Sequence, residues 1–168
     1  MNRILGQGRS ALMALAIGAV ALMAANKPAP EMNYRDMNGG MVNLKELTQK
    51  GPVVVVFWAT CCAPCIQEAK PLVKIYNQYA SQGFSVVAVS EDGTKATPKV
   101  KQFVKVQKWP YFVVVDNNKE LKTKFGVVEV PTLFLIDKNG IIVYSHTGYM
   151  PGDEKKLEKE IAALFESK

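Results

Sequence analysis

Three cysteines lie within five residues of the chain, and their spacing could support redox or metal chemistry. Cys62 and Cys65 have Cys-x-x-Cys spacing, and Cys61 directly precedes them. Cysteines this close together cannot form a set of disulfides that joins distant loops, and a bridge between them adds little stability by loop closure. The thiolate form of cysteine exchanges disulfides and binds soft metal ions. The cluster therefore predicts a reactive site rather than a structural crosslink.

The cysteine pair falls between a predicted strand and a predicted helix. A continuous β-branched and aromatic run over 52–59 is typical of a strand buried on both faces. Apolar residues recur at helical spacing over 67–82, and Gly83 predicts the end of that helix. The first turn of a helix offers free backbone N–H groups and the positive end of the helix dipole, and both stabilise a thiolate. Pro64 suits this turn, because the N–H that proline lacks is not needed there.

Strands and helices alternate through the rest of the chain. We predict a hairpin over 32–42 and a short helix over 44–49 that Asn43 caps. Further strands are expected over 84–90, 111–116, 132–137 and 141–145, and further helices over 99–108, 119–125 and 153–167. This order predicts an α/β fold with a central mixed β-sheet flanked by helices on both faces.

The N-terminal segment has the composition of an export signal. Arg3 and Arg9 precede an apolar stretch over 11–25, and a polar, proline-containing stretch over 26–31 follows. Such segments are typical of secretory signals, and this stretch is short for a membrane span, which needs about 20 residues. We predict a signal peptide or N-terminal membrane anchor over 1–25, a linker over 26–31 and one domain over 32–168. The domain would then be periplasmic or on the outer face of the cytoplasmic membrane, where disulfides persist.

The overall composition is that of a globular protein. Apolar residues make up 48% of the chain and charged residues 21%. The formal net charge is +6, but the chain has no arginine-rich run and no basic stripe with interleaved aromatic residues. We therefore expect no nucleic-acid partner. We also expect a monomer that contacts the membrane only through an N-terminal anchor.

Two segments resemble the active site of a known family. Residues 58–65, WATCCAPC, resemble the thioredoxin active-site sequence, and Val130-Pro131-Thr132 resembles the cis-proline loop of that family. The export signal, the extra N-terminal segment YRDMNGGMVNL and Glu68 narrow the resemblance to the TlpA/ResA-type exported thiol–disulfide oxidoreductases. The resemblance covers about residues 32 to 165. It implies a thioredoxin fold with an extra N-terminal β-hairpin, and redox chemistry that needs no cofactor and no metal.

The resemblance also implies a mechanism and its partners. The Cys62 thiolate would attack a substrate disulfide, and Cys65 would then resolve the mixed disulfide. Pro131 would lie beside the bound substrate as part of the catalytic site. The residues expected to bind substrate are Trp58, Ala63, Pro64 and Val130. The implied partners are disulfide-containing exported proteins, such as apocytochromes c, and a membrane thiol-electron donor.

Several residues depart from the family pattern or allow two interpretations. Val56 stands where classical thioredoxins carry a buried Asp, and Glu68 is either its replacement in proton transfer or a solvated helix residue. Cys61 is interpreted as a spectator, because adjacent cysteines rarely pair, with mixed disulfides or metal capture as the alternative. Pro71 lies one residue later than the usual helix proline. Glu129 either contacts substrate or is a solvated loop residue.

Two other functions fit parts of the pattern. Cys61 and Cys65 have the Cys-x-x-x-Cys spacing of Sco-like copper chaperones, which use a distant histidine; His146 is the one histidine of the chain, and it is otherwise expected to be a half-exposed strand residue. A thiol peroxidase would place a threonine three residues before its cysteine, whereas Thr60 lies two residues before Cys62. The pair between the redox cysteines is Ala-Pro, without a histidine to stabilise the thiolate further, which favours a reductant over an oxidant.

Overall fold

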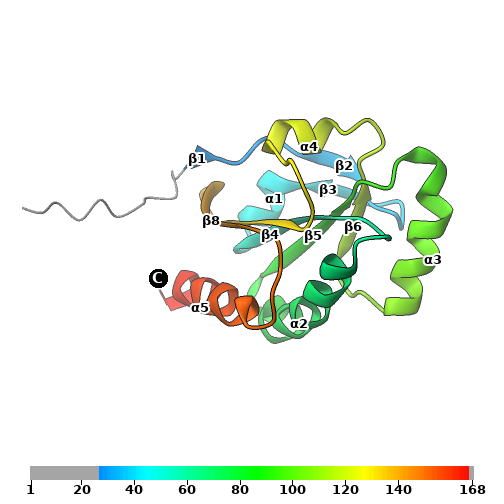
Figure 1. Cartoon of the computed structure of the whole chain (residues 1–168). Coiled ribbons are helices and arrows are strands. Elements are labelled where there is room, and N and C mark those ends of the chain that lie inside the picture. The colour runs from blue at the N-terminus through cyan, green and yellow to red at the C-terminus, as the bar shows by residue number, and fades with distance from the viewer. Residues whose placement is uncertain (1–26, 167–168) are drawn as a thin grey trace, which may run out of the picture.

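A six-stranded mixed sheet forms the centre of the structure (Figure 1). The computed structural model describes residues 27–166, so the predicted export segment over 1–25 lies outside the described residues. Strands β4 to β6 run parallel to one another, and β7, β8 and β1 continue the sheet in antiparallel pairs. In spatial order the strands are β1 (Lys27–Pro28), β8 (Ile141–Thr147), β7 (Thr132–Ile136), β4 (Val53–Trp58), β5 (Ser85–Ser90) and β6 (Phe112–Val115).

Helices cover both faces of this sheet, as predicted (Figure 1). One apolar cluster joins the sheet to α2 (Ala63–Tyr79), α3 (Thr97–Gln107) and α5 (Asp153–Glu166). The other joins it to α1 (Leu44–Thr48) and α4 (Glu120–Phe125). Successive side chains of β4 alternate between the two clusters, so every residue of this strand is buried. Short 3-10 turns, η1 (Ala80–Gln82) and η2 (Thr94–Ala96), follow α2 and precede α3.

The extra N-terminal hairpin is present and covers one edge of the sheet. It consists of β2 (Asn33–Arg35) and β3 (Met41–Asn43). The Asp36 carboxylate accepts a hydrogen bond of 2.9 Å from the backbone N–H of Val113 on β6. The backbone N–H of Met37 donates to the Val113 carbonyl, also over 2.9 Å. These bonds satisfy backbone groups on an edge strand that would otherwise be open to pairing with another chain.

Two elements begin well before the sequence-based expectation. The range predicted as a linker contributes β1, in which Lys27 pairs with Ile142, because β8 offers an unpaired edge and proline is tolerated in an edge strand. Helix α2 begins at Ala63, four residues before the apolar repeat, because Cys62 caps it. Within residues 27–166, no helix has the length and apolar character needed to cross a membrane.

Candidate active site

Cys62 and Cys65 lie at the start of α2 and are joined by a disulfide bond of 2.01 Å. Cys62 is the N-cap of the helix, and its Sγ accepts a hydrogen bond of 3.2 Å from the backbone N–H of Cys65. Cys65 is 2% exposed, whereas Cys62 is half-buried. Cys62 is therefore the sulfur that a second molecule can reach, and Cys65 is its buried partner.

The start of α2 is suited to a thiolate on Cys62. The helix is 17 residues long, its first turn contains no acidic residue, and Pro64 occupies the second helical position. The helix dipole and the Cys65 N–H therefore both favour a negative charge on the Cys62 sulfur. Ala63 and Pro64 are exposed beside that sulfur, where an incoming chain can touch them.

The predicted cis-proline loop lies against the cysteine pair. The Val130–Pro131 peptide bond is cis, and the Val130 carbonyl oxygen lies 3.7 Å from Cys62 Sγ. The Pro131 side chain is buried, and its carbonyl accepts a hydrogen bond of 2.8 Å from the Gly148 N–H. The backbone beside the reactive sulfur is thus that of Val130. Glu129 is exposed in the same loop.

Two polar residues that the sequence analysis did not pair fix the turn before the cysteines. The Thr60 backbone N–H donates to Asp92 Oδ2 over 2.9 Å, and its hydroxyl donates to the other oxygen of the same carboxylate. Strands β4 and β5 are parallel neighbours, so the residues after their carboxyl ends meet, and this rule could have suggested the pair. The hydroxyl hydrogen of Thr60 is thus directed to Asp92 and not to Cys62.

Trp58 supports the cysteine loop from within the protein. It is 1% exposed, and its ring packs against those of Trp109 and Phe103 at centroid distances of 4.5 and 5.5 Å. Because Trp58 is buried, it supports the cysteine loop from below. The prediction that Trp58 contacts substrate is therefore wrong. The contribution of Trp109 was missed, because the sequence gives no sign that a residue 51 positions later packs on Trp58.

Glu68 is buried, which contradicts the interpretation of a solvated helix residue. It lies almost one helical turn beyond Cys65 and is 7% exposed. Burial raises the pKa of its carboxyl from 4.5 to about 8, and the negative charge of Asp153 contributes to the shift. Glu68 is therefore an uncharged acid across much of the neutral pH range.

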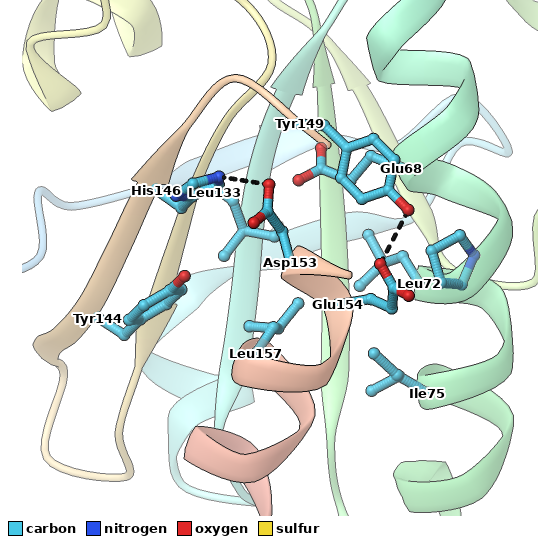
Figure 2. A pocket seen from close by; sticks show the side chains of 11 residues that line it. Glu68, Leu72, Ile75, Leu133, Tyr144, His146, Tyr149, Asp153, Glu154 and Leu157 are labelled. Carbon is cyan, nitrogen blue, oxygen red and sulfur yellow. Dashed lines mark hydrogen bonds and ion pairs between the residues drawn. The ribbon is translucent and has the colours of Figure 1, made fainter. Parts of the chain in front are cut away.

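Two small cavities border Glu68. The inner cavity is lined by Cys65 and Val56, among others, and the outer cavity by His146 and Asp153 (Figure 2). Each has a volume of about 10 Å³, enough for about one water molecule. Because Val56 and Glu68 line the same inner cavity, the Glu68 carboxyl comes from the helix into the region where classical thioredoxins present an Asp from the strand.

The residues named for metal chemistry are not brought together. Cys61 is exposed and free, while His146 lies on β8 with its Nε2 atom 3.1 Å from Asp153 Oδ2. Among the residues that the structure describes, no group of three or more His, Cys, Asp and Glu side chains is placed to hold a metal ion.

A Cys-x-x-Cys pair that starts a helix after a central strand, with a cis-proline loop beside it, defines the thioredoxin-like thiol–disulfide oxidoreductases. The chain belongs to the AhpC/TSA family, whose sequence model matches residues 25–145. It is 34% identical to the thiol-disulfide oxidoreductase ResA of Bacillus thuringiensis subsp. konkukian over 75% of this chain and 71% of that protein. The ResA of Bacillus subtilis is also 34% identical, over 73% of this chain and 66% of that protein.

A solved structure is similar over nearly the same range. The crystal structure of a Chlorobium tepidum protein assigned as the thiol:disulfide interchange protein DsbE matches with a TM-score of 0.76 and 32% identity. The match covers 83% of this chain and 96% of that chain. The fold, the family and the thiol–disulfide oxidoreductase activity expected from the sequence are thus confirmed.

Proposed function

We propose that this oxidoreductase reduces disulfides of other exported proteins, and that Cys62 and Cys65 carry the reaction. The proposal rests on one observation above all: Cys62 presents a half-buried sulfur at the start of α2, beside the Val130 carbonyl, while Cys65 lies buried behind it. The chain would act in the periplasm or on the outer face of the cytoplasmic membrane. A membrane thiol donor would return the pair to the dithiol form.

The first half of the reaction belongs to Cys62. In the reduced protein its thiolate attacks one sulfur of a substrate disulfide, and the other substrate sulfur leaves as a thiolate that takes a proton from water. The Cys65 N–H and the helix dipole stabilise the attacking thiolate before this step. Ala63, Pro64 and Val130 would border the bound substrate chain.

The second half of the reaction belongs to Cys65 and Glu68. The Cys65 thiol passes its proton to the ionised form of Glu68, and the resulting thiolate attacks Cys62, reforming the Cys62–Cys65 bond and releasing the second substrate sulfur. Proton transfer is most efficient between groups of similar proton affinity. The pKa of Glu68, about 8, is close to the ordinary value of about 8.5 for a cysteine thiol. Both side chains line the inner cavity, which gives the proton a short path.

Each of the two loops that adjoin Pro131 carries one exposed large apolar side chain. Val128 is 89% exposed in the loop before it, and Met150 is 71% exposed in the loop whose Gly148 contacts it. Exposed apolar side chains in loops that adjoin the cis-proline favour unfolded polypeptide segments over small polar thiols. Apocytochromes c, which expose their cysteines before haem attachment, are substrates of this kind.

The direction of the reaction is tested by the reduction potential of the Cys62–Cys65 pair. We expect a potential below about −200 mV when the protein is equilibrated with thiol buffers of known ratio, because no histidine stabilises the thiolate further. The fractions of dithiol and disulfide can be counted by mass spectrometry after alkylation. A potential near about −120 mV, as in a strong oxidant of the DsbA type, would contradict a reductant.

A further inference from the structure

The outer cavity places a second carboxylate opposite Glu68. Figure 2 shows Glu68 reaching from α2 toward Asp153 at the start of α5, with His146 on β8 beside Asp153. The Asp153 and His146 side chains are 31% and 33% exposed, so they lie at the mouth of the cavity while Glu68 lies at its buried end. The two carboxyl groups thus face the same water-sized space, with the Glu68 carboxyl shielded from solvent and the Asp153 carboxylate partly open to it.

The position of the Asp153 carboxylate is fixed by two neighbours. The Met150 backbone N–H donates to Asp153 Oδ2 over 2.8 Å, and His146 Nε2 lies 3.1 Å from the same oxygen. The hydrogen bond from Met150, followed by that of His146, lowers the pKa of Asp153 below its usual value of 3.8. Asp153 is therefore ionised at every pH at which Glu68 titrates.

Few other charges can act on Glu68. Among the described residues that line its two cavities, none is lysine or arginine. Glu154 is held at the mouth by Tyr149, whose hydroxyl donates to it over 2.9 Å. Burial raises the pKa of Tyr111, so this residue stays neutral. The titratable groups that face Glu68 from other elements are Tyr111, Tyr144, His146, Tyr149, Asp153 and Glu154.

We propose that Asp153 is a positioning residue for the proton of Glu68: its carboxylate, held at the mouth of the outer cavity by Met150 and His146, keeps the proton on Glu68. A negative charge across the cavity opposes the ionisation of Glu68. Asp153 touches neither cysteine nor substrate and acts only through Glu68. The effect of Asp153 on the proton of Glu68 is independent of the proposed function. Any resulting effect on the resolving step of Cys65 rests on that function.

The direct test is a titration of the Glu68 side-chain carboxyl by carbon NMR in the oxidised protein. In Asp153→Asn, where the amide oxygen can still accept the Met150 N–H, the midpoint of Glu68 should move to lower pH by at least about 0.3 unit. The matched control is Glu158→Gln, which removes a carboxylate from the same helix but outside the lining of both cavities, and should leave the midpoint within about 0.1 unit. An unchanged or higher midpoint in Asp153→Asn, or an equal shift in both variants, would overturn the proposal.

Two further measurements separate this proposal from the proposed function. If Asp153→Asn does not fold, Asp153→Ser keeps a short polar side chain at the start of α5 and should also give a downward shift; no shift would count against the proposal. In single-turnover experiments, the pH at which Cys65 resolves a mixed disulfide should fall in Asp153→Asn by the shift that NMR measures. A shifted Glu68 midpoint with an unshifted resolution step would support the role of Asp153 and contradict the role of Glu68 in the proposed reaction.

Discussion

At the scale of single residues, burial sets Glu68 apart from the usual surface glutamate. A glutamate on a helix usually points into water, but here it is 7% exposed between two cavities. No lysine or arginine compensates for its burial among the described residues that line them. Retaining such a group costs stability, which is consistent with a chemical role rather than a structural one.

The stability cost of Glu68 should appear in the pH dependence of unfolding. The pKa of its carboxyl is about 8 in the folded protein and close to 4.5 in the unfolded chain. The unfolded chain therefore ionises first, and the folded state loses stability as the pH rises from about 4.5 to about 8, by about 1.4 kcal/mol for each pKa unit. Glu68→Gln should remove this loss. At about pH 8 the free energy of unfolding of the variant should therefore exceed that of the wild type by a few kcal/mol.

Denaturant unfolding of the oxidised proteins at about pH 5 and about pH 8 measures this difference. The control is Glu166→Gln, which changes an exposed glutamate at the end of α5 and should keep the wild-type pH dependence. A Glu68→Gln variant whose stability changes between the two pH values by the same amount as that of the wild type would contradict the raised pKa of Glu68.

At the scale of elements, the N-terminal hairpin bonds to the edge of the sheet through the Asp36 carboxylate and the Met37 N–H. Asp36 is 7% exposed and accepts the N–H of Val113 on the edge strand β6. Asp36→Ala leaves this buried donor without its partner, which costs about 1–3 kcal/mol of unfolding free energy. Glu31→Ala, an exposed acidic residue just before the hairpin, should cost less than about 0.5 kcal/mol. Equal losses in denaturant unfolding would show that the bond between hairpin and sheet is unimportant.

The element order could be predicted from sequence, but parts of the boundaries and contacts could not. The buried run of β4 and the apolar repeat of α2 are local signals, and both elements form where those signals lie. The start of α2 at Ala63 escaped prediction because the capping bond of Cys62, rather than an apolar repeat, begins the helix. The strand at Lys27 escaped because only its pairing with β8 makes it a strand.

In the candidate site, too, local sequence features could be predicted, whereas contacts between distant elements could not. The cysteines and the cis-proline loop are recognisable from type and spacing. The burial of Glu68 and its opposition to Asp153 depend on how α5 packs near α2, and these helices are separated by most of the sheet in sequence. No local pattern reports such a contact, because residues 85 positions apart meet only through the fold.

At the scale of the whole molecule, export follows from the segment over 1–25 and remains a prediction. Fusion of the complete chain to alkaline phosphatase, which becomes active only where its disulfides form, should give an active reporter outside the cytoplasm. Deletion of residues 1–25 should abolish that activity without lowering the amount of fusion protein. An active reporter after the deletion would contradict the assignment of this segment to export.

The central claim is that Cys62 is the sulfur that attacks substrate and Cys65 is the sulfur that resolves. Cys65→Ser removes the resolving thiol, so a mixed disulfide should accumulate when this variant meets a peptide disulfide. Peptide mapping by mass spectrometry then identifies the cysteine that carries the adduct. The structure predicts an adduct on Cys62, with Cys62→Ser giving no rapid adduct; an adduct that forms chiefly on the exposed Cys61 would contradict the account.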